Sequence, residues 1–548
     1  MPKIRVLFWT LRYLRPSQII GRIFYKFYTP SIDLTKIPSI SKLPDNWVKP
    51  ARRKTSMVSP TEFILLNERK TFPLSQGWTD STVSKLWIYN LHYFDDLNAR
   101  DAERRKHWHR DLLCKWVKDN PPVKGVGWDP YPTSLRIVNW IKWALSGNTL
   151  DEQCVKSLAT QSRWLVKRLE YHLLGNHLFV NAKALVFAGL YFEGEEAERW
   201  LKTGMKILQT EIPEQILSDG GQFERSTMYH ALALEDILDL VNIVTAYPER
   251  IAPKYLAVVD LIKKQVNQMR HWLMSMSHPD GRIAFFNDAA YGVAPETEEL
   301  ESYARRLGFD DKNIPEKRIT NLRDSGYINI HVSELNLLID VARIGPDYLP
   351  AHAHADTLSY EMSLFGQRVL VNSGTSKYGV DHERLKQRAT ASHNTVTVDG
   401  NDSSEIWSGF RVARRAYPSE CLVEESSAAI HIIYEHNGYM RLPGKCIHRR
   451  DWLVKDRSLL ITDSIRGAFK EACSYMYFHP DVMIRDTNEN AQFSITLTSG
   501  QEVLIKIENA SSCELNDSNW HPEFGLSVKN KCIVAKFSAS EIKTRMAW

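Results

Sequence analysis

The sequence has no hydrophobic run that could cross a membrane, because none of its apolar stretches approaches the roughly 18 residues that a spanning helix needs. The first apolar stretch, Val6 to Leu11, holds only six residues before Arg12 and Arg15 interrupt it. It therefore lacks the apolar core of a secretory signal peptide. We expect a protein without a signal peptide that stays in the cytoplasm.

Cysteine is scarce and its spacing shows no pairing. The seven cysteines are odd in number, widely scattered and form no CxxC pair of the kind that chelates a metal or carries out redox chemistry. They are Cys114, Cys154, Cys421, Cys446, Cys473, Cys513 and Cys532. This pattern favours free thiols in a reducing compartment.

The chain also lacks a strong charge of either sign. Its 70 Lys and Arg residues against 65 Asp and Glu residues leave a net charge of +5, too small over 548 residues for a general nucleic-acid coat. We expect no nucleic-acid partner. Hydrophobic residues make up 43% and charged residues 25%, as in globular proteins, and the length allows two to four domains of about 100–200 residues.

Acidic residues are absent from the first 32 positions, where basic and aromatic residues are frequent. The set comprises Lys3, Arg5, Arg12, Arg15, Arg22 and Lys26 with Phe8, Trp9, Tyr13, Phe24, Tyr25, Phe27 and Tyr28. This composition suits peripheral contact of residues 1–32 with an anionic membrane, at the inner membrane face. The alternative is a basic helix that packs against the body of the protein with its arginines in solvent.

The spacing of apolar residues changes once along the chain. From about Asp95 to Leu307 it predicts successive amphipathic helices, and after Asn313 a period of two predicts antiparallel strands. A run of helices before a run of strands predicts an all-α domain joined to an all-β domain. We place a lead-in segment at 1–94, the helical domain at 95–315 and the strand domain at 316–548.

Individual elements follow from the same spacing. Helices are predicted over Val155–Leu174, Leu178–Phe192, Ala231–Tyr247 and Tyr255–Met276. Strands are predicted over Tyr327–Val332, Leu358–Val371 with a turn at Gly366-Gln367, Thr395–Val398, Ile430–Tyr434, Trp452–Ile461, Tyr475–Phe478, Phe493–Leu497 and Cys532–Phe537.

The densest group of chemically active residues is His352-Ala353-His354-Ala355-Asp356. In a strand, side chains two apart point to one face, so the two imidazoles and the Asp356 carboxylate would share a surface. His393 precedes a predicted strand and could complete a metal site with His354. The alternative is a chance HxH sequence without function.

Two polar segments stand out in the helical half. Gly175-Asn176-His177 interrupts an apolar stretch, and a glycine-containing loop from Asp219 leads into a helix with Tyr229 in its first turns. Taken alone, each is also consistent with an ordinary turn between helices.

Taken together, these segments resemble the heparinase II/III-like polysaccharide lyase superfamily, which pairs an α/α toroid with an antiparallel β-sandwich. The motifs that carry the resemblance are Gly175-Asn176-His177, Glu224 to Tyr229, His352 to Asp356, Asn372-Ser373-Gly374-Thr375 and Ser392-His393-Asn394-Thr395, within a similarity that runs from Trp128-Asp129-Pro130 to Phe478-His479-Pro480. The resemblance implies an incomplete N-terminal α/α toroid followed by a C-terminal antiparallel β-sandwich. Because one fold supports many chemistries, the activity needs its own argument.

The resemblance implies β-elimination at a uronic acid within a polysaccharide. Asn176, with His177 beside it, corresponds to the group that holds the substrate carboxylate and stabilises its enolate-like transition state. Tyr229 and His352 match the acid/base positions, and Tyr378 is a third candidate. The sequence does not divide base from acid among them.

Relatives in this superfamily hold a structural zinc ion with His, Asp and His, and the corresponding positions here are His354, Asn372 and His393. An amide oxygen is a weaker ligand than a carboxylate, so we expect zinc to bind weakly or to be absent unless Asp356 takes the place of Asn372. No organic cofactor is expected.

Charged residues within or beside these motifs favour an anionic polysaccharide or oligosaccharide as the partner. We expect Glu224, Arg225, Arg388 and Arg411 to contact it, with Arg384 and Lys386 nearby. The first hypothesis is therefore a lyase-like enzyme that acts on a uronate-containing bacterial polysaccharide, in the metabolism of a surface polysaccharide. The alternatives are a glycoside hydrolase on an α/α toroid, with carboxylates such as Glu224, Asp219 and Asp288, or a catalytically silent glycan-binding protein.

Overall fold

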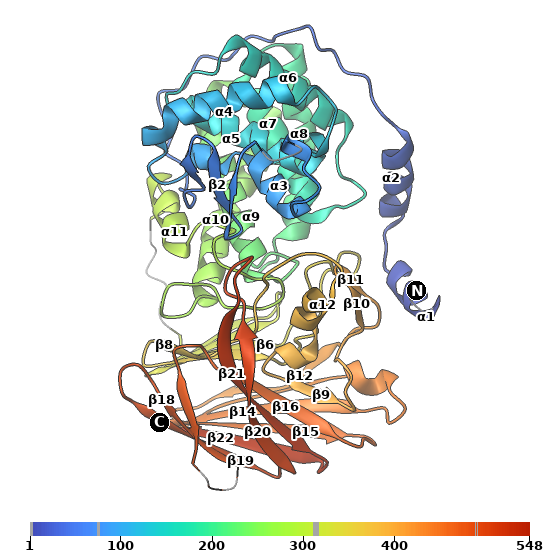
Figure 1. Ribbon diagram of the computed structural model, residues 1–548, viewed down its shortest axis with the longest axis vertical. Coiled ribbons are helices and arrows are strands. Elements are labelled where there is room, and N and C mark those ends of the chain that lie inside the picture. Colours follow the sequence, from blue (N-terminus) through green and yellow to red (C-terminus); the bar gives the residue numbers. More distant parts are fainter. Residues whose placement is uncertain (1–3, 74–76, 311–316, 488, 490) are drawn as a thin grey trace.

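The computed structural model describes residues 4–548 except 74–76, 311–316, 488 and 490. Its two halves lie one above the other, a helical half built from the N-terminal part of the chain and a sheet half built from the C-terminal part (Figure 1). The predicted order, helices first and antiparallel sheets second, is confirmed. The last helix of the helical half ends at Arg306 and the next strand begins at Ile319. The predicted boundary at 315/316 lies outside the described residues.

The helical half is built from helices of 9 to 21 residues joined by short turns. They are α3 (Lys85–Tyr93), α4 (Lys106–Asp119), α5 (Pro130–Leu145), α6 (Glu152–Lys167), α7 (Gly175–Tyr191), α8 (Glu195–Gln215), α9 (Thr227–Ala246), α10 (Leu256–Ser275) and α11 (Thr297–Arg306). A small sheet of β1 (Met57–Ser59), β2 (Glu62–Leu65) and β3 (Glu68–Thr71) precedes them. Two further helices, α1 (Ile4–Leu11) and α2 (Pro16–Phe27), lie at the periphery (Figure 1).

Helix α7 is the centre of the helical half because it is buried on every side. It is buried from Leu178 through Tyr191 and packs against α5, α8 and α9. The preceding helix, predicted to reach Leu174, ends at Lys167 instead. The chain turns there because the Asn181 side chain accepts a hydrogen bond from the Glu170 backbone N–H at 2.9 Å. A side chain eleven residues ahead thus fixes the start of this turn.

The sheet half contains three antiparallel sheets of four or more strands among the described residues. The first is β4 (Ile319–Leu322), β5 (Tyr327–Val332), β6 (Leu335–Asp340), β7 (Tyr360–Leu364) and β8 (Gln367–Leu370), in that order. The second has the order β12 (Pro418–Glu425), β13 (Ile430–His436), β14 (Ile447–Lys455), β15 (Ser458–Arg466), β22 (Glu541–Ala547), β19 (Glu502–Glu508), β18 (Gln492–Thr496) and β17 (Met483–Asp486). The third is β20 (Ser512–Trp520), β21 (Val528–Phe537), β16 (Ala472–Tyr477) and β9 (Val396–Val398).

One apolar core joins these sheets, with residues such as Ile339, Trp452 and Phe537 from three of them fully buried. A short hairpin, β10 (Ile406–Ser408) with β11 (Arg411–Val412), and the helix α12 (His382–Arg388) lie on the side that faces the helical half (Figure 1). The loops on this side therefore meet the helices.

Two strand predictions need correction. The segment Trp452–Ile461 is not one strand but the turn of the hairpin β14–β15, where Asp456 takes a left-handed conformation with φ of 46°. An aspartate tolerates this conformation, so the turn forms without the glycine that would have marked it. The second correction concerns His352–Asp356, which lies in the loop between β6 and β7 instead of a strand. Its backbone forms hydrogen bonds with residues outside the sheets. For example, the Ala355 N–H donates to the Arg388 carbonyl at 2.9 Å.

Candidate active site

A cleft of about 770 Å³ lies between the helical half and the sheet half. All five residues predicted to act in catalysis line it: Asn176, His177, Tyr229, His352 and Tyr378. The first three come from the helical half and the last two from loops of the sheet half. The fold thus brings together residues that are up to 202 positions apart in the sequence.

Tyr229, His352 and Tyr378 form one contact group. The two phenol oxygens lie 3.0 Å apart, and the ring of Tyr229 lies over the His352 imidazole with the ring centroids 3.9 Å apart. Burial and the neighbouring Tyr378 raise the pKa of Tyr229 well above its usual value, and burial does the same for Tyr378. Both phenols therefore stay protonated at neutral pH.

The local sequence fixes Tyr229 in the first turn of α9. Ser226 is the N-cap residue of this helix, and its Oγ accepts a hydrogen bond from the Tyr229 backbone N–H at 3.1 Å. The same hydroxyl donates a hydrogen bond to the backbone carbonyl of Asp288. The start of α9 is thereby tied to the segment that holds His352.

Asn176 and His177 lie in the first turn of α7. Gly175, with φ of 54°, opens this helix, and a Cβ there would come within 2.4 Å of Leu349. A side chain at this position would be strained by the positive φ, so glycine is favoured at the start of the helix. The positive end of the α7 dipole and the Asn176 side chain suit a carboxylate in the cleft.

His177 is partly exposed in the cleft and is held by an acidic neighbour. Its Nδ1 lies 3.1 Å from a carboxylate oxygen of Glu170, and its ring packs on Tyr131. Burial opposes the charged imidazolium, but the Glu170 carboxylate outweighs it and raises the pKa of His177 above its usual value. His177 therefore carries more positive charge near neutral pH than a free histidine.

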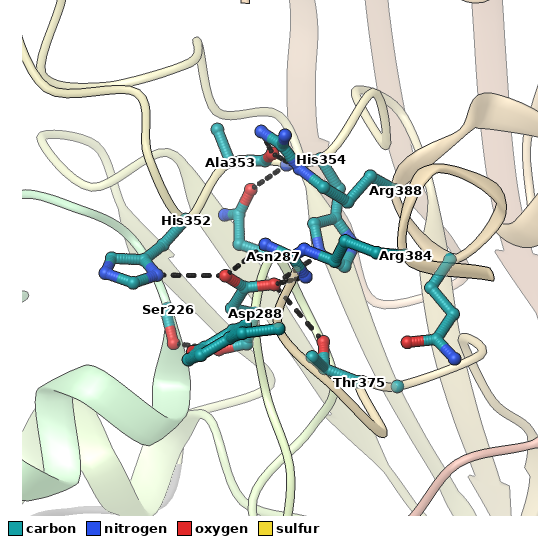
Figure 2. A network of polar contacts seen from close by, with 12 residues as sticks. Ser226, Asn287, Asp288, His352, Ala353, His354, Thr375, Arg384 and Arg388 are labelled. Carbon is teal, nitrogen blue, oxygen red and sulfur yellow. Dashed lines mark hydrogen bonds and ion pairs between the residues drawn. The ribbon is translucent and has the colours of Figure 1, made fainter. Parts of the chain in front are cut away.

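Asp288 is the centre of the polar network beneath the cleft (Figure 2). Its carboxylate accepts hydrogen bonds from His352 Nδ1 and His354 Nε2, each at 2.9 Å, and from both terminal nitrogens of Arg384. Burial opposes ionisation, but the Arg384 guanidinium and the two imidazoles hold the pKa of Asp288 well below its usual range. Because an ionised Asp288 only accepts, His352 carries its hydrogen on Nδ1 and keeps a lone pair on Nε2.

The sequence offered Asp288 only as one of several acidic residues, and its role in this network was missed. It follows Phe286-Asn287 in an irregular segment without periodicity. The signal that could have found it is chemical: a buried imidazole that works in proton transfer needs a partner for its second nitrogen. Sequence spacing does not say which acid supplies that partner.

The predicted metal ligands His354 and His393 lie together, with Asp356 beside them. His354 Nδ1 lies 3.2 Å from His393 Nε2, and one ligand atom from each of His354, Asp356 and His393 lies within 4.8 Å of the others. The Asn372 Oδ1 accepts a hydrogen bond from the Asn394 backbone N–H at 3.1 Å. Within this group the carboxylate is that of Asp356.

The donor set His354, Asp356 and His393 fits a zinc ion. All three residues are buried, and His393 Nδ1 has no hydrogen-bond partner among the described residues. Burial lowers the pKa of His393 to about 4, so its imidazole is neutral and able to ligate. Two imidazoles and a carboxylate are the ligand types of many zinc sites.

The three arginines predicted to bind substrate do not line the cleft. The Arg225 guanidinium donates to the backbone carbonyl of Ser325 at 2.8 Å, and that of Arg388 donates to Ala353 O at 2.6 and 3.0 Å. Both are buried, so they hold loops of the sheet half in place. Arg411 does not line the cleft, and burial together with the nearby Arg22 lowers its pKa. Arg384 pairs with Asp288, and Lys386 is exposed on α12.

Glu224 also differs from its prediction. Its side chain is buried below the cleft lining, where one carboxylate oxygen lies 3.7 Å from His352 Nε2 and the other accepts from Gln222 at 3.4 Å. Burial raises the pKa of Glu224. The carboxyl group therefore contacts the acid/base group instead of the cleft space.

The cleft has its own set of charges, which sequence reasoning missed. Seven cationic side chains and five acidic ones line it, namely Arg52, Arg53, Lys54, Arg100, Lys142, Lys183 and Arg282 against Asp95, Glu235, Asp236, Glu296 and Glu523. Several form pairs, such as Lys183 with Asp236 at 2.7 Å. Arg100 and Arg282 are exposed and form no ion pair with any described residue. They are dispersed in the sequence, and no motif marks them.

The fold places a tyrosine and histidine group in a cleft between a helical half and antiparallel sheets. The chain belongs to the heparinase II/III family: the model of the heparinase II/III N-terminus matches residues 95–307, and that of the heparinase II/III-like C-terminal region matches residues 314–548. The resemblance drawn from the sequence motifs is thereby confirmed.

Individual relatives are similar at modest identity. A heparin-sulfate lyase from Bacteroides stercoris is 27% identical over 359 residues, which cover 61% of this chain and 50% of that protein. A heparin-sulfate lyase from Pedobacter heparinus is 27% identical over 256 residues, which cover 42% of this chain and 36% of that protein. A crystal structure of heparinase III shares the fold with a TM-score of 0.71 and 16% identity, over 97% of this chain and 89% of that one.

The chain matches about half the length of the curated relatives, or less. Their activity therefore does not transfer to this chain by similarity alone. Among the described residues, no helix combines the length and apolarity needed to cross a bilayer.

Proposed function

We propose that the protein is a polysaccharide lyase that cleaves a uronic-acid-containing, anionic polysaccharide by β-elimination. The observation that carries the proposal is the contact group in the cleft, where the Tyr229 hydroxyl lies 3.0 Å from that of Tyr378 and the Tyr229 ring lies over His352. Asn176 and His177 line the same cleft. Elimination needs these three capacities together: a base, an acid and donors for the substrate carboxylate.

In the proposed mechanism Asn176 and His177 hold the uronate carboxylate. Removal of the proton beside it places further negative charge on the carboxylate oxygens in the transition state. The Asn176 amide donates hydrogen bonds that strengthen as this charge develops, and the positive charge on His177 acts in the same direction. The raised pKa of His177 favours the charged form that this task needs.

His352 is the proposed base and Tyr229 the proposed acid. The ionised Asp288 fixes the hydrogen of His352 on Nδ1, so Nε2 accepts the C5 proton and the resulting imidazolium is stabilised by the same carboxylate. Tyr229, protonated because of its raised pKa, donates to the leaving oxygen at C4. Tyr378 lies within hydrogen-bond distance of the Tyr229 oxygen and helps to keep the Tyr229 phenol protonated until the leaving oxygen takes its proton.

Other residues of the cleft support an anionic substrate. Arg100 and Arg282 form no ion pair with a described residue and are exposed at the cleft, so they are available to carboxylate or sulfate groups. A glycoside hydrolase is not favoured. Glu224 and Asp288 are buried, and Asp219 accepts hydrogen bonds from the backbone of Gly221 and Ser325. None of these three carboxylates faces a second one across the cleft space.

A zinc ion is proposed at His354, Asp356 and His393. When bound, it would fix the loop that carries His352, because His354 Nε2 already contacts Asp288. Elemental analysis of purified protein tests this directly. Stoichiometric zinc that is lost in Asp356→Asn but retained in Asn372→Ala supports the set, and zinc loss only in the latter variant contradicts it.

We also propose that the enzyme works in the cytoplasm, on polysaccharide destined for the cell surface. All seven cysteines are free, which supports a reducing compartment. Cell fractionation of the native host tests this location, and recovery from the medium or periplasm would contradict it.

The lyase proposal is tested with a panel of uronate-containing polysaccharides, sulfated and unsulfated, with a neutral polysaccharide as control. Elimination creates a double bond at the new non-reducing end, which is detected by its ultraviolet absorbance. We expect a rise in absorbance with at least one acidic polymer, abolished in His352→Gln. New reducing ends without this absorbance would indicate a hydrolase instead.

A further inference from the structure

The N-terminal segment, residues 4–28 with α1 and α2, leaves its large apolar residues exposed, and the one residue of its two helices that is buried is polar. Gln18 is the one residue of the two helices that is buried, at 1% exposure, and its amide donates to the Tyr348 carbonyl at 3.2 Å. A surface helix of a globular protein normally does the reverse and turns its apolar stripe to the core. The inversion shows that this stripe does not serve the packing of the protein.

The exposed apolar residues are large and form one stripe on each helix. Ile4, Phe8 and Leu11 on α1 and Ile20, Ile23, Phe24 and Phe27 on α2 are each more than half exposed. Their spacings of three and four residues place them on one face of each helix. Single exposed hydrophobic residues are common, but seven within 24 positions form a patch that marks an interaction site.

Polar contacts fix the segment to both halves of the protein. Thr10 accepts a hydrogen bond from Trp407 Nε1 at 3.0 Å, and the Tyr13 and Tyr417 hydroxyls lie 3.2 Å apart. Arg15 pairs with Glu214 of α8. These contacts hold the two helices at the edge of the molecule (Figure 1), and the apolar stripes stay exposed.

The charges of the segment select the partner. Arg5, Arg12, Arg22 and Lys26 form no ion pair with a described residue, and the segment contains no acidic residue. Arg22 lies near Arg411, which adds a further cation. Two copies of the chain joined through these stripes would bring like charges together, which opposes a symmetric dimer. An anionic lipid surface satisfies both the apolar stripes and the cations.

We propose that α1 and α2 lie in the surface of an anionic phospholipid bilayer and attach the protein to it peripherally. With 8 and 12 residues, the helices are too short to span the bilayer, so they rest at the headgroup level with the apolar stripes toward the acyl chains. The attachment does not depend on the proposed lyase activity. It places the cleft near the membrane, because Arg411 beside Arg22 directly follows Phe410, which lines the cleft.

The test is co-sedimentation of the full-length protein with vesicles of phosphatidylcholine alone or mixed with phosphatidylglycerol. We expect binding to the mixed vesicles at low salt, and a loss of about tenfold or more when salt is raised or when Arg5, Arg12 and Lys26 are replaced by Gln. The variant Phe8→Gln, Ile20→Gln, Ile23→Gln and Phe27→Gln should lose binding by at least the same factor. A matched control replaces the exposed Leu256 and Met483, which lie outside the segment, by Gln and should bind like the unaltered protein.

Because the substituted side chains are exposed, the variants should keep the thermal unfolding curve of the parent. A failure of the intact protein to bind anionic vesicles at low salt would overturn the proposal. The proposal would also be overturned if the variant with four apolar-to-Gln substitutions bound these vesicles as well as the unaltered protein. Analytical ultracentrifugation distinguishes the competing partner: a dimer that dissociates in this variant, without vesicle binding by the parent, would show that the stripes bind a second copy of the chain.

Discussion

The hydroxyl groups of Tyr229 and Tyr378 lie 3.0 Å apart, although one tyrosine belongs to helix α9 and the other to a loop of the sheet half. This contact closes the cleft between the two halves at the point where His352 meets Tyr229. Proton transfer at this point depends on both halves and on their relative position. The predictions below separate the groups that exchange protons from those that hold them in place.

Removing one phenol tests the proposed acid. Tyr229→Phe keeps the ring over His352 but removes the proton donor, so kcat should fall by ~10²-fold or more with little change in KM. Steady-state kinetics on the acidic polymer that the panel identifies measures both. Tyr247→Phe is the matched control, since the Tyr247 hydroxyl is buried without a partner among the described residues. A Tyr229→Phe enzyme with full turnover would remove this residue from the mechanism.

The low pKa of Asp288 predicts a specific loss of stability in acid. A carboxyl whose pKa is lowered by folding contributes stability above its unfolded pKa of about 3.9, and that contribution is lost as the pH falls through the lower folded value. The free energy of unfolding should therefore decrease below about pH 4. In Asp288→Asn this part of the decrease should be absent, although the variant is less stable at every pH because Arg384 loses its partner. Denaturant unfolding at several pH values measures it, and parallel curves would contradict the assignment.

The Glu170 carboxylate is expected to control the charge of His177. In Glu170→Gln the source of the raised pKa is removed and burial remains, so the pKa of His177 should fall below its value in the unaltered protein. NMR titration of the His177 ring signals measures this change. A raised pKa contributes stability below the unfolded value of about 6.5 and loses it as the pH rises through the folded value, so the variant should show a smaller loss above neutrality. An unchanged pKa would show that Glu170 does not act on this imidazole.

Two arginines should separate substrate binding from folding. Arg388→Ala removes buried charged donors to Ala353 O, so it should lower the free energy of unfolding by about 2 kcal/mol or more. Arg282→Ala, at an exposed cleft position, should leave unfolding unchanged and raise KM for the acidic polymer several-fold. Thermal unfolding and steady-state kinetics of both variants test this contrast. If Arg388→Ala instead raised KM and left unfolding unchanged, Arg388 would be a substrate-binding residue after all.

The fold class was accessible from the sequence for physical reasons, and the acid/base candidates came from the resemblance to the heparinase II/III-like superfamily. Apolar periods of 3.6 and two residues persist over long stretches, so they predict the order of helices and strands. Asn176, Tyr229 and His352 stand in short polar motifs that interrupt apolar segments. Their meeting in one cleft follows from the way the two halves pack, which no local pattern encodes.

What the sequence did not reveal depends on contacts between distant residues. The sequence suggested Arg388 as a cation that binds substrate, but its guanidinium donates hydrogen bonds to the Ala353 carbonyl. Asp288 is the hydrogen-bond partner of His352, and no spacing in the sequence marks it for this role. Asp356, which the sequence offered only as a substitute for Asn372, lies beside His354 and His393 in a segment that is a loop and not a strand. In each case the sequence does not show which distant residue is the partner of a buried polar group.

The measurement that tests the central claim most directly is mass spectrometry of the oligosaccharides released from an acidic polymer by the unaltered protein and by Tyr229→Phe. Elimination yields products lighter by one water than those of hydrolysis, because a double bond forms in place of the added water. We predict these unsaturated products from the unaltered protein and about a hundredfold less of them from the variant. Saturated products, or unsaturated products in equal amounts from both proteins, would contradict the account.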